Sequence, residues 1–306
     1  MLILEGCSQG QDETGELVKV EATSAPRYER DSMPDGVFDN MIDTPRFNFK
    51  SIGHDDLRWP NGVITVAFEG GSPKLQQLVE EAAQDWTALG GGIEFSFRKE
   101  DGSFRTWSSK DTTPSAMIRI SFRTTEKHGG YWSMTGTLAR YVDSSEPTMN
   151  YGGFLTDLTR YYDGRSKREW LASYERGTIL HEFGHALSLA HEHYHPDCQA
   201  DMNIEAIVQR TIKRNKWNER KARHAMVYST YLKNLYGGRY IDNASIVSGD
   251  IGLASIWLYY SVTNPSGSVE PYYKSGIDSP CIPSLEAGYA SVLSPGDKAY
   301  YLLVYG

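Results

Sequence analysis

The sequence predicts an α/β fold in which a twisted mixed sheet packs against helices, and two observations support this prediction. Residues 63–68 (VITVAF) are β-branched and alternate as a strand does, and a helix-like segment at 74–89 follows them. Strand-like segments then occur at 93–97 and 117–122. A strand, a helix and a strand in this order predict parallel strands joined by a right-handed crossover.

The segment 74–89 is expected to be the helix that backs this sheet. Its apolar residues recur on one face at helical spacing: Leu75, Leu78, Val79, Ala82, Ala83, Trp86 and Leu89. Three glycines at 90–92 end this helix, because glycine adopts the left-handed backbone that terminates helices. Short strand-like segments follow at 131–134 and 148–151.

The second half of the chain is predicted to be mainly helical. One helix is expected from about residue 169 to residue 187, and residues 203–235 are charged and helix-like. The last helix has a clear start, with Ser294 as N-cap, Pro295 at the first position and Asp297 at the third.

Two parts of the chain differ in composition. Residues 1–56 are rich in Asp, Glu, Gly, Pro and Ser and are predicted to be an extended or disordered leader, which can act as a propeptide. Residues 57–306 are expected to form the ordered catalytic domain. No signal peptide is visible, because Glu5 interrupts the apolar start of the chain. The longest apolar segment, at 251–262, is too short to span a bilayer.

Composition and charge exclude several classes of protein. The 306 residues are 40% hydrophobic and 23% charged, which excludes a disordered or collagen-like chain. A net charge of -8 argues against a nucleic-acid partner, whose binding depends on neutralising phosphates. The three cysteines do not predict a disulfide scaffold or a cysteine zinc site. Cys198 and Cys281 can form a disulfide in a secreted protein, and unpaired thiols are the alternative.

The segment 181–191 (HEFGHALSLAH) predicts a metal site. On a helix, His181 and His185 lie on one face and can present two imidazoles to one metal, with Glu182 beside them. His191 can reach the same metal only if the chain leaves the helix and turns back toward His181 and His185. Three nitrogen ligands with one open position are typical of catalytic zinc, and we expect one Zn²⁺ per chain. A chance pair of histidines on a surface helix would not account for the third.

The extended motif at 181–193 (HEFGHALSLAHEH), with LRWPNG at 57–62 and TMNYG at 148–152, resembles the astacin-like branch of the metzincin zinc endopeptidases. Microbial and fungal members of that branch have the same order of blocks. The resemblance covers residues 57–305. It implies a metzincin-type catalytic domain, with a backing helix and a zinc helix above a mainly helical C-terminal half. It also implies hydrolysis of peptide bonds and zinc binding by His181, His185 and His191.

The resemblance also implies roles for three further residues. Glu182 would be the general base that takes a proton from zinc-bound water and delivers it to the leaving amine. Glu192 matches the acidic residue that follows the third histidine and has a structural role. Tyr259, in SIWLY at 255–259, would be the phenol that stabilises the oxyanion. An alternative Met-x-Tyr ends at Tyr228, but it lies in a charged, helix-like segment, so Tyr259 is preferred.

Two residues depart from the family pattern. Ser188 stands where the family has the glycine that turns the chain toward the third ligand, which should cost about 1 kcal/mol in the left-handed region. Trp257 replaces the methionine of the turn beneath the metal. Both residues predict reduced activity rather than loss of zinc. They also motivate the alternative that the chain is a non-catalytic zinc-containing protein that binds peptides, whereas Glu182 favours an enzyme.

The resemblance implies protein or peptide substrates and an extracellular location, and the protein is expected to be a monomer. Tyr131, Trp132, Ser133 and Met134 would form a strand at the substrate edge, which pairs with an extended peptide through main-chain hydrogen bonds. An ordinary sheet edge is the alternative for this strand. The motif also allows a hydrolase that acts on a bond other than a peptide bond.

Overall fold

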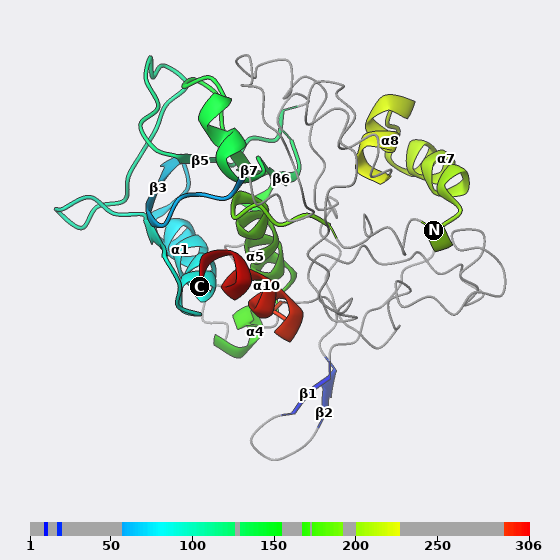
Figure 1. Ribbon diagram of the computed structural model, residues 1–306, viewed down its shortest axis with the longest axis horizontal. Helices are drawn as coiled ribbons and strands as arrows, with labels where there is room; N and C mark the ends of the chain where they lie inside the picture. The colour runs from blue at the N-terminus through cyan, green and yellow to red at the C-terminus, as the bar shows by residue number, and fades with distance from the viewer. Residues whose placement is uncertain are drawn as a thin grey trace.

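The computed structural model describes residues 9–11, 17–19, 57–125, 129–154, 167–171, 173–191, 200–226 and 291–306. Its main feature is a five-stranded sheet in the order β4-β3-β5-β7-β6 (Figure 1). The strands are β3 (Gly62–Glu69), β4 (Ile93–Ser96), β5 (Ile118–Ser121), β6 (Tyr131–Ser133) and β7 (Met149–Tyr151). β6 pairs antiparallel with β7, and the other pairs are parallel. The predicted mixed sheet is therefore confirmed, with β6 at one edge.

Apart from one 3-10 helix, which the sequence does not predict, the helices of the described residues follow the predicted order. They are α1 (Pro73–Thr87), the 3-10 helix η3 (Gly136–Tyr141), α4 (Lys167–Leu171), α5 (Tyr174–Ala186), α7 (Ile204–Asn215), α8 (Glu219–Met226) and α10 (Pro295–Tyr305). The predicted start of α10 is confirmed, since Ser294 and Asp297 form a capping box. Two short strands, β1 (Gln9–Gln11) and β2 (Leu17–Lys19), pair with each other in a separate sheet.

The prediction of one helix from residue 169 to residue 187 is wrong. α4 ends at Leu171, and α5 begins at Tyr174. Ser173 separates them with extended backbone, and its side chain accepts a hydrogen bond from the amide of Arg176. Serine is a favoured N-cap because its hydroxyl satisfies an amide that has no partner within the helix. The metal-site helix is therefore an independent element with its own capped start.

α5 lies in the interior of the domain, in contact with α1, β6 and η3. The indole of Trp86 on α1 donates a hydrogen bond to the carbonyl of Leu180 at 3.0 Å. The ring of Phe183 packs on Phe95 and Phe97, with ring centroids 5.0 and 5.9 Å apart. α10 lies beside both helices (Figure 1), where its Tyr301 ring is 5.8 Å from Trp86. Every residue of α5 from Glu175 to Ala186 is buried.

Strand β5 is buried on both of its faces. Ile118 and Ile120 belong to the hydrophobic core, whereas Arg119 projects from the other face. The Arg119 guanidinium donates hydrogen bonds to four carbonyls, those of residues 116, 142, 143 and 146. The three bonds to residues 142, 143 and 146 hold the chain before β7 against the sheet, and all four satisfy a charge that is expensive to bury. No helix of the described ranges is long and apolar enough to cross a membrane.

Candidate metal centre

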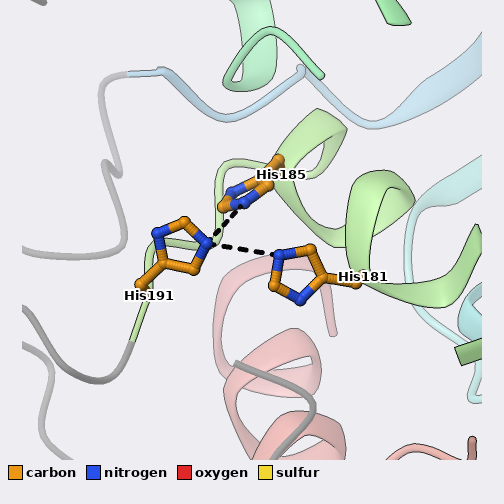
Figure 2. A group of neighbouring side chains, drawn as sticks. All are labelled: His181, His185 and His191. Carbon is orange, nitrogen blue, oxygen red and sulfur yellow. Dashed lines mark hydrogen bonds between the residues drawn. The ribbon is translucent and has the colours of Figure 1, made fainter. Parts of the chain in front are cut away.

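Three imidazoles meet at the end of α5. His181 and His185 project from successive turns of the helix, and His191 follows after the chain has turned back (Figure 2). The Nε2 of His191 lies 3.2 Å from the Nε2 of His185 and 3.2 Å from the Nε2 of His181. All three side chains are buried, and one nitrogen of each lies within 4.8 Å of the others. The structure thus brings together the three residues predicted as ligands.

These distances fit a zinc ion. Two nitrogens that bind a tetrahedral zinc at about 2.0–2.1 Å lie about 3.3–3.4 Å from each other. The Nδ1 of His185 lies 2.8 Å from the carbonyl oxygen of Leu189, which can only accept a hydrogen bond. The Nδ1 of His185 therefore carries the proton, and its Nε2 presents a lone pair toward the other two imidazoles. Such an outer hydrogen bond is typical of histidines that bind metals.

The turn that delivers His191 is centred on Ser188. Ser188 has a φ of 70°, in the left-handed region. Its amide donates to the carbonyl of His185 at 2.8 Å, and the amide of Leu189 donates to the carbonyl of Gly184 at 3.0 Å. This pair of bonds is a Schellman motif, which most often has glycine at the left-handed position. The positive φ expected for Ser188 is therefore present although the residue is not glycine.

Glu182 is completely buried next to the first ligand, His181. The fully buried Tyr151 of β7 lies near it, and the hydroxyl of Tyr151 donates to the carbonyl of Ile179 at 3.4 Å. Burial, and secondly the negative charge of Glu182, raise the pKa of the Tyr151 phenol well above its usual range. Tyr151 therefore stays neutral at ordinary pH and adds no second negative charge to this part of the site.

Two buried side chains that are not among the predicted site residues contact the end of α5. The indole of Trp59 donates to the carbonyl of Ala186 at 2.7 Å, and the hydroxyl of Tyr305 donates to the carbonyl of Leu187 at 3.0 Å. Trp59 belongs to the block at 57–62 that carries the family resemblance, so the sequence does contain a signal that points to this residue. No local signal points to Tyr305, which is 118 residues from its partner.

The other predicted site residues fall into two groups. Tyr131, Trp132 and Ser133 form the edge strand β6, and all three are buried, as is Met134. Their part in substrate binding stays a prediction. The remaining candidates lie outside the described residues: Glu192, Trp257, Tyr259, Cys198 and Cys281.

Comparisons with known proteins agree with this geometry. The chain is similar to the solved structure of myroilysin, with 27% identity over 82% of this chain and 96% of that one and a TM-score of 0.54. The chain has an astacin-like fold. The astacin-like resemblance indicated by the sequence blocks is thereby confirmed.

Three further comparisons gave more distant or partial results. A crystal structure of myroilysin is 26% identical over 81% of this chain and 86% of that one, with a TM-score of 0.45. High choriolytic enzyme 1, a hatching enzyme zinc-protease from the medaka fish Oryzias latipes, is 16% identical over 82% of this chain and 95% of that one, with a TM-score of 0.42. Among curated proteins, the iron-sulfur cluster assembly protein CyaY of Pseudomonas syringae pv. tomato is 29% identical over 97 residues, which are 30% of this chain and 88% of CyaY. No family profile matches the chain.

Proposed function

We propose that this protein is a zinc metalloendopeptidase that hydrolyses internal peptide bonds. The observation that carries the proposal is the convergence of three imidazole nitrogens, with the buried Glu182 carboxylate adjacent to the first of them in sequence. The astacin-like fold supports the same activity. Three neutral nitrogen ligands leave one coordination position for water or substrate, whereas a structural zinc site has four protein ligands.

Each site residue has a distinct task in this proposal. His181, His185 and His191 would hold one zinc ion per chain through Nε2. When bound, zinc acts as a Lewis acid and lowers the pKa of water toward about 7. Glu182 would take up a proton from the attacking water at a carboxylate oxygen and deliver it to the leaving amine. The hydrogen bond from His185 to Leu189 keeps the ligand in the correct tautomer and orientation.

The substrates in this proposal are proteins or peptides. β6 lies at an edge of the sheet and is proposed to align an extended substrate beside the metal centre. The net charge of -8 supports the absence of a nucleic-acid partner. We further propose an extracellular location, by resemblance to the family, and a monomer. Light scattering on the purified protein and its detection in growth medium would test these two points.

The activity is tested with a pair of glutamate variants on one helix. Glu182→Gln removes the proposed base, whereas Glu175→Gln makes the same change at a buried residue about 10 Å earlier along α5. Zinc content is measured by mass spectrometry, and hydrolysis of casein is followed with and without a chelator. We expect about one zinc per chain in both variants, and a loss of casein cleavage of at least about 100-fold in Glu182→Gln alone.

Three results would contradict the proposal. Chelator-sensitive cleavage that persists in Glu182→Gln would show that another group is the base. Zinc binding without cleavage of casein, of a peptide library or of ester substrates would instead favour the non-catalytic peptide-binding protein. Cleavage of esters alone would indicate a hydrolase that does not act on peptide bonds.

A further inference from the structure

The end of α5 is completed by hydrogen bonds from two segments that are distant in sequence. Trp59 lies just before β3, and its indole nitrogen donates to the carbonyl of Ala186 at 2.7 Å. Tyr305 lies in the last turn of α10, and its hydroxyl donates to the carbonyl of Leu187 at 3.0 Å. The two donors are also connected, because the amide of Trp59 lies 3.4 Å from the Tyr305 hydroxyl and donates to it.

These two carbonyls are the ones that the local turn leaves without a backbone partner. The carbonyls of Phe183, Gly184 and His185 accept hydrogen bonds from the amides of Leu187, Leu189 and Ser188, respectively. Because Ser188 reverses the chain, no described amide reaches the carbonyls of Ala186 and Leu187. Both carbonyls lie in a buried segment, where a backbone acceptor needs a partner from elsewhere in the protein.

Trp59 and Tyr305 are themselves held by parts of the domain other than α5. The carbonyl of Tyr305 accepts a hydrogen bond from the amide of Gly92 at 2.7 Å. A Cβ on Gly91 would lie 2.6 Å from the same oxygen, so the contact requires glycine there. The guanidinium of Arg140 lies 4.9 Å from the centre of the Trp59 ring. The two donors therefore form a fixed frame against which the turn is held.

The turn that they hold leads directly to two ligands. Leu189 accepts the Nδ1 proton of His185, and His191 follows two residues later. A shift of the carbonyls of Ala186 and Leu187 would therefore move the Leu189 carbonyl and the His191 imidazole together. We propose that Trp59 and Tyr305 are positioning residues of the zinc site, which hold the turn in the conformation that places His191 against His181 and His185. This inference rests on the proposed zinc site.

The matched test uses two tyrosines of one helix. Tyr305→Phe removes the donor to Leu187, whereas Tyr301→Phe makes the same change one turn earlier on the same buried face. The hydroxyl of Tyr301 makes no hydrogen bond within the described part of the chain. Zinc affinity is measured by competition with a chromophoric chelator, starting from metal-free full-length protein. We expect affinity to fall about tenfold in Tyr305→Phe and to change less than about twofold in Tyr301→Phe.

A positioning role is separated from a purely structural one by unfolding experiments with and without zinc. If Tyr305 positions the ligands, the stabilisation gained from zinc shrinks in Tyr305→Phe, because bound metal stabilises in proportion to the logarithm of its affinity. If Tyr305→Phe is equally destabilised in both states and its zinc affinity is unchanged, the inference is overturned.

A second variant keeps the test decisive if Tyr305→Phe does not fold. Trp59→Phe retains an aromatic ring and removes the donor to Ala186. It is also expected to lower zinc affinity, and an unchanged affinity in this variant would overturn the inference. Failure of the unmodified protein to bind zinc would contradict the proposed function itself, so the two failures are distinguishable.

Discussion

His185 donates a hydrogen bond from Nδ1 to the carbonyl oxygen of Leu189 at 2.8 Å, across the turn that follows α5. The bond joins the second proposed ligand to the segment that carries the third. It places the proton on Nδ1 and leaves the Nε2 lone pair for a metal. Because the same turn sets the position of His191, the protonation state of one ligand and the location of another depend on a single backbone conformation.

Zinc affinity is expected to fall as the pH is lowered. Protons compete with the metal for the Nε2 lone pairs of the three histidines, so metal binding releases protons. We expect the affinity at about pH 5 to be at least about tenfold lower than at about pH 7.5, since ordinary imidazoles titrate near pH 6.5. Chelator competition at several pH values measures this. An affinity that does not change over this range would show that imidazoles do not hold the metal.

Ser188→Gly is expected to stabilise the protein. The φ of 70° costs serine about 1 kcal/mol relative to glycine, part of which is offset by the greater freedom of glycine in the unfolded chain. We expect a net gain of about 0.5 kcal/mol in the free energy of unfolding, with zinc content unchanged, measured by urea denaturation. Lys216→Gly, at the other non-glycine residue of positive φ in the described ranges, should gain a similar amount. A loss of zinc in Ser188→Gly would contradict this account.

Gly136→Ala is expected to destabilise the domain strongly. A Cβ at this position would lie 2.0 Å from the carbonyl oxygen of Leu57 and 3.1 Å from the Cβ of Ser188. The matched control is Gly102→Ala, because Gly102 also has a positive φ but no atom within 4 Å of the added Cβ. We expect a cost of about 1 kcal/mol for Gly102→Ala and about 3 kcal/mol or more for Gly136→Ala in thermal unfolding. Equal losses of stability in Gly136→Ala and Gly102→Ala would mean that the strain of a positive φ alone determines both, without a contribution from the contact with Leu57.

Stability is expected to fall at alkaline pH through Tyr305. Burial raises the pKa of its phenol to about 12, whereas an unfolded tyrosine titrates near pH 10. Between these two pKa values the unfolded chain releases a proton that the folded protein retains. The stability contributed by the buried phenol of Tyr305 is therefore complete below about pH 10 and is lost as the pH rises through about 12. From about pH 9 to about pH 11, Tyr305→Phe should lose about 1 kcal/mol less than the unmodified protein in denaturant titrations. Identical losses would contradict the assignment.

The local parts of the site could be predicted from sequence. The spacing of His181, His185 and His191 determines which side chains meet, because helical geometry and one turn suffice to bring them together. The positive φ of Ser188 follows from the same requirement. The division of the predicted helix at Ser173 was not apparent, because apolar residues continue on both sides of it and the serine looks like an ordinary helical residue.

The non-local parts could not be predicted. Trp59 and Tyr305 reach α5 across 127 and 118 residues, and no periodicity connects such distant positions. Their role depends on how α10 and the segment before β3 pack in three dimensions. A buried tyrosine hydroxyl also looks the same in sequence whether it donates to a carbonyl, as Tyr305 does, or makes no described hydrogen bond, as Tyr301 does.

The contact between Tyr305 and Leu187 has a consequence for the order of events during translation. The ribosome adds roughly 5–20 residues per second, so the 118 residues between these partners take about 6–24 s to synthesise. The nascent chain therefore contains all three imidazoles for several seconds before the hydroxyl that supports their turn has been made. A metal ion that arrives in this interval meets a ligand set whose final geometry is not yet enforced.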